Sequence, residues 1–280
     1  MTDQTKRHAR FRALHEGPRP FLLPNAWDAG SARLLASRGF QALGTTSAGF
    51  AFSKGLRDSF AGLSREALLE NAAEIAAATD LPVSADLEDG FGAAPETVAE
   101  TIRLATAAGL VGGTIEDATG DADDPLYDFG LAVERIAAAR EAARDLPFVL
   151  TARAEGFLWG RHDLDDAIRR LQAFAEAGAD VLYAPGLPNL DAIRTVCASV
   201  DRPVNVLMGL TGPRYTVDEL AEAGARRIST GGALARTALG ALARAADEML
   251  GQGTFGFAED AMPSDEITAL MSEEKAGNRA

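Results

Sequence analysis

Short apolar segments alternate with longer helical ones along most of the chain. Eight of the short segments have the length and apolar content of buried strands. Each is followed by a stretch with the composition or the end signals of a helix. The predicted strands begin at residues 21, 42, 83, 112, 148, 181, 204 and 227, and the predicted helices cover residues 29–38, 65–79, 95–108, 127–144, 164–177, 190–199, 217–223 and 233–250.

This alternation is typical of an α/β fold in which every strand is parallel. Eight strand–helix units in roughly 230 residues match the usual size of a (β/α)₈ TIM barrel. A doubly wound sheet is the competing architecture, and it predicts a glycine-rich phosphate turn after its first strand. The first strand is followed here by Trp27-Asp28-Ala29-Gly30, which lacks that turn. We therefore predict one barrel domain over residues 1–280, with a loop over residues 48–62 and a C-terminal tail over residues 251–280.

Cap residues support the boundaries of two predicted helices. Asp28 is a candidate N-cap, since its side chain can accept hydrogen bonds from the first helical turn. Gly39 is a candidate for the end of the same helix. Pro95 stands at the start of another helix, in the first turn, where a missing N–H costs nothing.

Composition limits the partners and the compartment. The 280 residues carry a formal net charge of −14, which argues against nucleic acid or an anionic membrane as a partner. Cys197 is the only cysteine, so the sequence offers neither an intrachain disulfide nor a cysteine cluster for zinc. No apolar run approaches the ~20 residues of a membrane span, and the polar N-terminus lacks the apolar core of a signal peptide. We expect a cytoplasmic protein without nucleic-acid or membrane partners.

One acidic stretch stands out as a candidate for metal chemistry. The third strand begins at Val83 and runs into Asp86-Leu87-Glu88-Asp89-Gly90. Asp86 and Glu88 are two residues apart, so on a strand their side chains share one side. Two carboxylates on one side of a buried strand repel each other unless a cation lies between them, and a divalent ion with oxygen ligands meets that need. The alternative is a strand that ends and releases its acids into a solvated loop.

Other polar residues gather where the predicted strands end, which is where barrels carry their chemistry. Strand three delivers Asp86 and Glu88, strand four delivers Glu116, and strand five delivers Arg153. Acids from neighbouring strands that face an arginine favour a site for a cation and a carboxylate over solvated strand ends. The alternative for Arg153 is a purely structural ion pair with Glu116 or Glu155.

Five motifs give the chain a family resemblance. They are Pro24-Asn25-Ala26-Trp27-Asp28-Ala29-Gly30-Ser31-Ala32-Arg33, Gly44-Thr45-Thr46-Ser47-Ala48-Gly49 with Gly55-Leu56-Arg57-Asp58, Ser84-Ala85-Asp86-Leu87-Glu88-Asp89-Gly90-Phe91-Gly92, Ile115-Glu116-Asp117, and Thr151-Ala152-Arg153-Ala154-Glu155-Gly156-Phe157. In this order they resemble the isocitrate lyase/phosphoenolpyruvate mutase superfamily, in its short form. The resemblance covers roughly residues 18–250, and it is the order of the motifs that makes it specific.

The resemblance implies a barrel whose eighth helix is exchanged between subunits of a homo-oligomer, a dimer or a tetramer. It implies a Mg²⁺ or Mn²⁺ cofactor, with Asp86, Glu88 and Glu116 as the metal residues. It implies a small carboxylate substrate, either a 2-oxo acid or an acid that becomes one, reacting through an enolate-like state. The catalytic residues would be Arg153, Glu116 and Asp58. Together with Trp27 and Asn205 at strand ends, the substrate-binding residues would be Thr46, Ser47, Ala48, Gly49, Asp86 and Arg153.

The chain also departs from the family pattern. Lyases of the family carry a Lys-Lys-Cys-Gly-His loop after the position of Glu116, and its cysteine supplies a proton. Here residues 117–125 contain no cysteine, lysine or histidine, and Ala118 and Ala184 replace a lysine and a histidine of the mutases. Cys197 is assigned to packing, and we expect the histidines, His15 included, on the solvated surface.

Three hypotheses for function follow. The first is a metal-dependent carbon–carbon lyase that cleaves or decarboxylates an oxaloacetate-like or methylisocitrate-like acid. Decarboxylation needs an electron sink but no dedicated base, so it tolerates the altered loop. The second is an enzyme of the P–C bond, of the phosphoenolpyruvate mutase or phosphonopyruvate hydrolase type. The third is a 2-oxo-acid-binding paralogue with weak turnover.

The end of the chain predicts an assembly. Leu239, Leu242, Met249 and Leu250 give the last long helix an apolar face, and two aromatic residues follow it. We expect the tail to pack on a neighbouring subunit. The acidic loop over residues 117–128 has the composition of a mobile lid.

Overall fold

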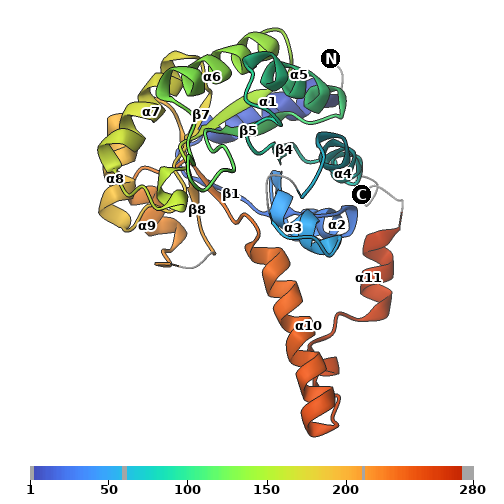
Figure 1. Ribbon diagram of the computed structural model, residues 1–280. Helices are drawn as coiled ribbons and strands as arrows, with labels where there is room; N and C mark the ends of the chain where they lie inside the picture. The colour runs from blue at the N-terminus through green and yellow to red at the C-terminus, as the bar shows by residue number, and fades with distance from the viewer. Residues whose placement is uncertain (1–2, 59–61, 210–211, 273–280) are drawn as a thin grey trace.

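The computed structural model describes residues 3–58, 62–209 and 212–272. Parallel strands form a nearly closed barrel with helices around it (Figure 1), as the sequence predicts. The strands are β1 (Phe21–Leu23), β2 (Asn25–Ala26), β3 (Leu43–Thr45), β4 (Val83–Asp86), β5 (Gly112–Glu116), β6 (Val149–Arg153), β7 (Val181–Tyr183), β8 (Val204–Leu207) and β9 (Arg227–Ser229). They pair in the order β1-β9-β8-β7-β6-β5-β4-β3-β2, and each of these pairings is parallel.

Helices separate most of the strands along the chain. They are α1 (Asp3–Glu16), α2 (Ala29–Ser37), α3 (Ser47–Ser53), α4 (Arg65–Ala77), α5 (Pro95–Ala107), α6 (Phe129–Ala143), α7 (Leu164–Glu176), α8 (Leu190–Ser199), α9 (Val217–Glu222), α10 (Ala233–Gln252) and α11 (Ser264–Met271), with the 3₁₀ segments η1 (Gly156–Trp159) and η2 (Gly256–Asp260). Asp28 caps α2 as predicted, in a reciprocal capping box with Ser31. Pro95 is the first residue of α5.

The predicted first strand is split in two by Pro24. β1 pairs with β9 and β2 pairs with β3, so the two short strands fill one position of the barrel. A proline cannot donate to a neighbouring strand, which explains the break. Asn25 then joins the two sides, because its Oδ1 accepts from Thr230 N and Gly231 N at 2.9 Å and its Nδ2 donates to Thr45 O at 2.6 Å.

The prediction of a loop over residues 48–62 is wrong in its first part. Ser47–Ser53 form α3, with Thr46 as its N-cap and with Phe50 and Ala51 buried. A run of small residues has little helical pattern of its own, so the sequence favoured a loop. Burial of Phe50 stabilises the helix here, which is a tertiary effect that local propensity does not contain.

The main hydrophobic core lies between the barrel and its helices. A smaller apolar cluster fills the N-terminal end of the barrel, and polar side chains line the interior beyond it. β6 illustrates the division. Leu150 and Ala152 point outward into the main apolar cluster, while Thr151 and Arg153 face the interior. Because side chains alternate along a strand, one short segment serves both layers. The interior is thereby left free for binding and chemistry.

Helix α1 closes the N-terminal end of the barrel, which the sequence did not predict. Phe11 is fully buried and packs with Phe21 and Val149 at the beginnings of strands. Gln4 Nε2 donates to the carbonyls of Thr106 and Leu110. The helix is polar over most of its length, so its apolar contact is carried by few residues.

The expectation of a solvated His15 is also wrong. His15 follows Phe11 by one helical turn and is 7% exposed, with its ring edge-on to Phe11 and Phe21. Its Nδ1 lies 2.8 Å from Phe11 O, and its Nε2 lies 3.5 Å from Nη1 of Arg227. Burial and the Arg227 charge lower the pKa of His15 to about 3. The imidazole is therefore neutral, with Nδ1 donating to the carbonyl and Nε2 free to accept.

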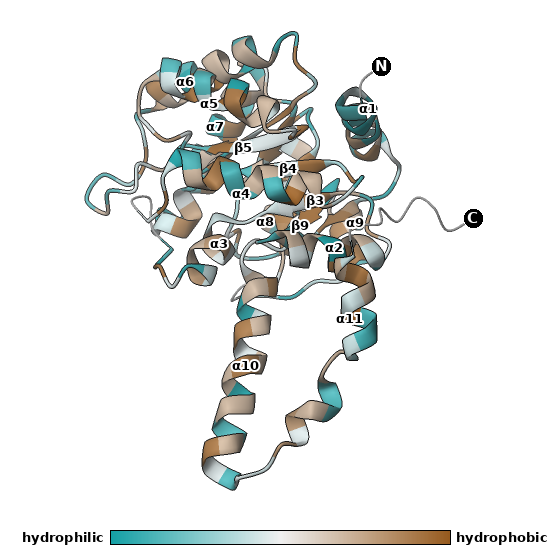
Figure 2. Ribbon diagram, turned by 90° about the vertical axis from the view of Figure 1, so that its right-hand side faces the viewer, coloured by the Kyte–Doolittle hydropathy of each residue, from teal (hydrophilic) through white to brown (hydrophobic). Residues whose placement is uncertain are grey.

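Helix α10 leaves the barrel and projects from it, and α11 returns beside α2 (Figure 1). Arg38 on the loop after α2 pairs with Glu266 of α11 at 2.9 Å. The projecting helix carries apolar as well as polar residues along its length (Figure 2). Among the residues that the structure describes, no helix is long and apolar enough to cross a membrane.

The buried His15 predicts a pH-dependent stability. The unfolded chain binds a proton at His15 below about pH 6.5, whereas the folded protein does not until about pH 3. The contribution of the neutral His15 to the free energy of unfolding is fully present above about pH 6.5. Between about pH 6.5 and about pH 3 it falls by about 1.4 kcal/mol for each unit by which the pH is lowered. His15→Gln cannot titrate, so urea unfolding at several pH values should give it a shallower acid dependence than the wild type. Identical pH slopes would contradict the assignment of a neutral buried His15.

Candidate active site

A cavity of about 450 Å³ opens at the carboxyl ends of the strands. Nine of the residues predicted for the site line it: Thr46, Ser47, Ala48, Asp58, Asp86, Glu88, Glu116, Arg153 and Asn205. Trp27 and Gly49 do not line it. They lie behind it, where a Cβ on Gly49 would come within 3.0 Å of Trp27 Cβ. The tight packing of Gly49 against Trp27 gives both a structural role in shaping α3.

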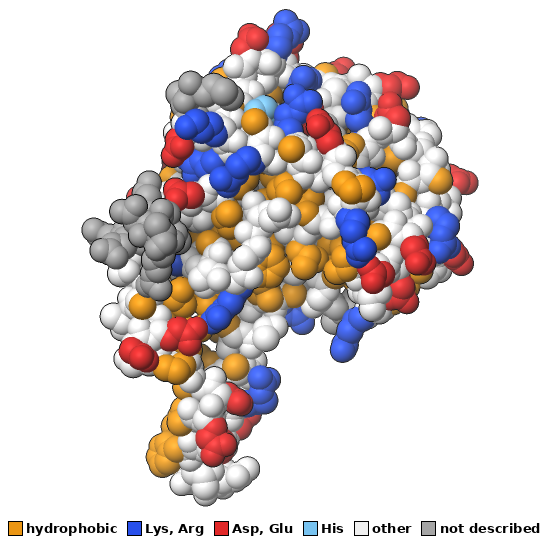
Figure 3. Space-filling view, turned by 180° about the vertical axis from the view of Figure 1, so that it is seen from behind, with side chains coloured by type: hydrophobic (Ala, Val, Ile, Leu, Met, Phe, Trp, Pro, Cys, Tyr) orange, Lys and Arg blue, Asp and Glu red, His pale blue; other side chains and the backbone are white. Residues whose placement is uncertain are grey.

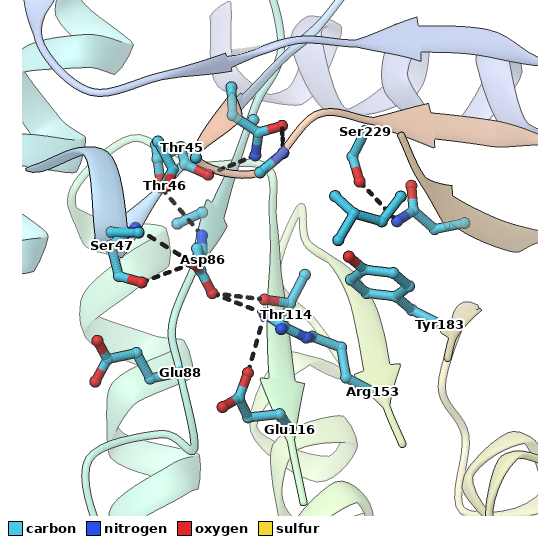
Figure 4. A pocket seen from close by; sticks show the side chains of 18 of the residues that line it. Thr45, Thr46, Ser47, Asp86, Glu88, Thr114, Glu116, Arg153, Tyr183 and Ser229 are labelled. Carbon is cyan, nitrogen blue, oxygen red and sulfur yellow. Dashed lines mark hydrogen bonds and ion pairs between the residues drawn. The ribbon is translucent and has the colours of Figure 1, made fainter. Parts of the chain in front are cut away.

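Asp86 stands at the centre of this cavity (Figure 4). Its Oδ2 accepts from Ser47 Oγ at 2.9 Å and from Ser47 N at 3.2 Å. Its Oδ1 accepts from Arg153 Nη1 at 3.0 Å. The carboxylate therefore joins the start of α3 to β6 across the end of β4.

Arg153 is surrounded by carboxylates. Besides Asp86, its Nη1 contacts Glu116 Oε2 at 3.0 Å (Figure 4). Its Nε donates to Glu155 Oε1 at 2.8 Å. Burial alone would lower the pKa of Arg153, but Glu116, Glu155 and Asp86 raise it well above its usual value. The two alternatives considered for Arg153 are thus joined in one residue, which makes structural ion pairs and faces the cavity.

The ionised forms of two further acids, Glu88 and Glu116, are destabilised. Burial, with Asp86 and Asp89 nearby, raises the pKa of Glu88 to about 8. Burial also raises the pKa of Glu116 well above its usual value, although Arg153 opposes the shift. Desolvation and like charges both disfavour ionised carboxylates. A cation placed among these acids would stabilise their ionised forms.

The residues fit a hydrated divalent ion better than a closed protein cage. Within the described residues, no three His, Cys, Asp or Glu side chains are arranged as a ready-made metal site. Mg²⁺ prefers oxygen ligands and keeps several waters, so one or two carboxylates suffice. Asp86 is the best placed of the three predicted metal residues, and Glu88 and Glu116 lie within the same cavity to hold water on the ion.

The start of α3 adds backbone donors to the cavity wall. The first N–H groups of a helix have no partner inside the helix. Ser47 N donates to Asp86, and Gly49 N donates to Thr46 Oγ1 at 3.2 Å. Ala48 lies between them and lines the cavity. An anion beside Ala48 would meet both its N–H and the positive end of the helix.

The family follows from comparison with known proteins. The family model described as "Phosphoenolpyruvate phosphomutase" matches residues 11–250. The chain belongs to the PEP mutase/isocitrate lyase superfamily. It is 31% identical to 2-methylisocitrate lyase of Escherichia coli strain K12 over 76% of this chain and 74% of that protein. The enzymes that it resembles are lyases and mutases.

Solved structures agree with this assignment. A protein of Burkholderia cenocepacia J2315, assigned only broadly to the lyases or mutases, is 57% identical, with a TM-score of 0.95 and 98% of both chains covered. The superfamily member 2,3-dimethylmalate lyase is 28% identical, with a TM-score of 0.85, 98% of this chain and 96% of that chain covered.

The acidic loop over residues 117–128 is anchored at its base. Ala118 and Leu126 form a bridge and are buried, and Gly120 reaches the cavity. Asp117 is buried too, and its Oδ2 pairs with Arg170 Nη1 at 3.1 Å. Motion of the whole loop as a lid stays a prediction, but the apolar anchors limit it to the exposed tip.

Sequence reasoning missed the arginine that supports the metal motif. Arg135 on α6 is 1% exposed, and its guanidinium donates to the carbonyls of Asp89, Gly92 and Ala93. It also stacks on Tyr127, with Cζ 3.8 Å from the ring centre. An arginine in the middle of a predicted helix gives no sequence signal for this role.

This support matters because the loop after β4 is strained. Glu88 and Phe91 have φ angles of 49° and 66°, which side-chain-bearing residues rarely adopt. Such conformations persist only when surrounding contacts hold them. The orientation of Glu88 therefore depends on the contacts of Arg135 with the carbonyls that follow it.

Arg135→Met should lower the free energy of unfolding by roughly 2–4 kcal/mol, because it leaves buried carbonyls without donors. It should also weaken Mg²⁺ binding, since Glu88 loses its fixed orientation. Arg140→Met is a matched control on the same helix, because the Arg140 side chain is 41% exposed in its contact with Asp180. Chemical unfolding and calorimetry measure both effects. Equal losses in the two variants would contradict a special role for Arg135.

Proposed function

We propose that this enzyme is a divalent-metal-dependent lyase that acts on a 2-oxo acid or a related 2-hydroxy carboxylate through an enolate-like state. The reaction would be C–C cleavage or decarboxylation of an oxaloacetate-like or methylisocitrate-like acid. The observation that carries the proposal is the contact of Arg153 with both Asp86 and Glu116 at the mouth of the barrel. It brings together in one cavity a guanidinium, the carboxylate that would bind the metal, and an acid of raised pKa.

Asp86 would hold Mg²⁺ or Mn²⁺ directly, with Glu88 and Glu116 binding through water. When bound, such an ion withdraws electrons from the 2-oxo and carboxylate oxygens of a substrate. Groups of the protein itself would orient the metal residue and the substrate. Ser47 orients Asp86 through two hydrogen bonds, and the Ala48 N–H would receive a substrate carboxylate.

Arg153 would stabilise the negative charge that develops as a bond to C3 breaks. Its guanidinium is already fixed by Glu155 and Glu116, so little reorganisation would be needed. Tyr183 lies beside it, with Arg153 Cζ 5.0 Å from the ring centre. Asn205, held by Ser229 and Arg227, would orient the substrate from the other side.

A carboxyl group would supply the proton that other lyases of the superfamily take from their loop cysteine. Among the described residues that line the cavity there is no cysteine, histidine or lysine. Burial raises the pKa of Glu116, which favours its protonated form, the form that can donate a proton. Asp58 is the other catalytic candidate, and burial and Asp86 raise its pKa as well.

Steady-state assays with oxaloacetate, methylisocitrate and phosphonopyruvate in Mg²⁺ test this proposal. We expect turnover of a carboxylate substrate, its loss in EDTA, and its loss in Asp86→Ala with the fold intact by circular dichroism. Asp123→Ala, on the exposed tip of the acidic loop, is the control and should keep full activity. Full activity of the wild type in EDTA would rule out the metal mechanism.

Metal affinity should depend on pH. Glu88, with its pKa near 8, is protonated below that pH, and a cation must displace the proton. Affinity for Mg²⁺ should therefore rise by about tenfold per pH unit up to about pH 8 and then level off. Glu88→Gln cannot release this proton, so calorimetry should show a smaller pH slope. Equal affinity at about pH 6 and about pH 8 in the wild type would refute the role of Glu88.

We also propose that residues 251–280, together with α10, pack on a neighbouring subunit. Leu242 and Leu250 on the projecting helix are 65% and 90% exposed, and Phe255 is 67% exposed. Leu22 on β1 is 40% exposed, an unusual state for a barrel strand, and hydrophobic side chains gather on the face seen in Figure 3. A second subunit that supplies its helix would cover both surfaces.

Light scattering at micromolar concentration should therefore give a mass of at least twice the 29.3 kDa monomer. Leu242→Glu should shift the mass toward the monomer, because it places a charge in the proposed interface. Asp201→Arg changes the charge of a side chain that is 81% exposed on the barrel and should leave the mass unchanged. A wild-type mass near 29.3 kDa would refute the assembly.

A further inference from the structure

A second arginine lies inside the barrel, and the function proposed above uses it only to hold Asn205. Arg227 on β9 is 1% exposed, and its side chain crosses the interior toward β6. Its Nη2 donates to Thr151 Oγ1 at 3.1 Å, and Thr151 precedes Arg153 by two residues on the same strand. The guanidinium therefore lies one layer of side chains below Arg153.

The partners of this guanidinium are all neutral. Nε donates to Asn205 Oδ1 at 2.8 Å, Nη2 bonds to Thr151, and Nη1 lies 3.5 Å from His15 Nε2. His15 has to stay neutral to accept, and its donated bond to Phe11 O is consistent with that state. These contacts use three of the five N–H donors of a guanidinium.

Among the described residues, no carboxylate pairs with Arg227. In the part of the chain that the structure describes, Arg227 makes no ion pair within 4.0 Å, whereas Arg153, Arg135 and Arg170 all do. Burial lowers the pKa of Arg227 to about 10, and the Arg153 charge adds to the effect. The phenol of Tyr183 is not a counterion, because burial raises its pKa and keeps it neutral. An uncompensated buried charge is costly.

Arg227 also lines the cavity that holds Asp86 and Arg153. It lies at the lower end of this cavity, meaning the end nearer the N-terminal ends of the strands. Ser84 lines the same cavity, two residues before Asp86 on β4, so it faces the same side of the strand. Its Oγ is buried and has no hydrogen-bond partner in the described structure. The cavity thus continues from Asp86 toward the N-terminal ends of the strands. There it reaches a guanidinium without a counterion and a hydroxyl without a hydrogen-bond partner among the described residues.

We propose that Arg227 is a specificity-determining residue that holds a second carboxylate of the substrate at the lower end of the cavity. This inference rests on the proposed function, in which the first carboxylate and the 2-oxo or 2-hydroxy oxygen lie near Asp86. The planar fork of Arg227 suits a carboxylate. Ser84 Oγ is a further donor on the same side. A substrate with a single carboxylate leaves Arg227 unpaired and binds less tightly.

Malate and lactate form a matched pair of probes for this subsite. Both offer a 2-hydroxy carboxylate to a metal ion, and only malate has a second carboxylate. Calorimetry in Mg²⁺, with both enantiomers of each, should give malate an advantage of about tenfold or more in affinity. Arg227→Gln should abolish the advantage by weakening malate far more than lactate, and Arg227→Lys should retain part of it.

The outcomes separate this subsite from the proposed function. Equal affinity for malate and lactate in the wild type, or an unchanged ratio in folded Arg227→Gln, overturns the subsite while Mg²⁺-dependent lactate binding upholds the metal site. Failure of both acids to bind in Mg²⁺ overturns the proposed function and the subsite with it. If Arg227→Gln does not fold, Arg227→Lys and Ser84→Ala serve as the test, because Ser84→Ala removes a hydroxyl that makes no hydrogen bond with the described residues. Each should lower the malate-to-lactate ratio.

Discussion

The ion pairs of Arg153 hold the mouth of the barrel together. Parallel strands bring their carboxyl ends to one edge, and in this chain those ends carry several acids that repel each other. One guanidinium on β6 contacts Asp86 from β4 and Glu116 from β5, and a third acid, Glu155, fixes its orientation. Without that charge the repulsion among these carboxylates would be uncompensated. The same arrangement makes the mouth suitable for chemistry, because its charges are held in place before any ligand arrives.

A second set of acids is kept away from the cavity by arginines of the surrounding helices. Asp89 lies beside Arg135 of α6 and accepts from the Tyr127 hydroxyl at 2.8 Å. Asp117 pairs with Arg170 of α7. In each case an acid next in sequence to a cavity residue turns outward and ties the strand end to a helix. In each of these two motifs, one acid faces the cavity and the next one binds a helix. The contacts of Asp89 and Asp117 with the helices fix the positions of Glu88 and Glu116. This division explains why the strained backbone after β4 is tolerated.

The barrel, its order of elements and most of the residues around the cavity could be predicted from the sequence, because they depend on patterns that are local. The alternation of strands with helices and the acids at strand ends are visible within a few residues of each other. The parts that could not be predicted depend on contacts between distant residues. Helix α3 forms because Phe50 finds a buried position, and His15 is buried because α1 covers strands that follow it in the chain. Arg135 and Arg227 bind carbonyls or side chains at least 22 residues away, and nothing in their own neighbourhood marks them.

Stability alone gives no reason for a charge at the position of Arg227. The main hydrophobic core of this protein lies outside the strands, so an apolar side chain inside the barrel would meet Leu23 and the cavity without any conflict of charge. A buried charge without a counterion carries a desolvation cost that an apolar side chain of similar volume does not carry. The interior instead keeps a cation, orients it through Asn205 and Thr151, and sets beside it a histidine that is forced to stay neutral. Each of these contacts fixes the direction of the guanidinium while leaving its charge unopposed. An arrangement that is costly without an anion and well ordered to receive one is accounted for by a ligand that brings the anion with it.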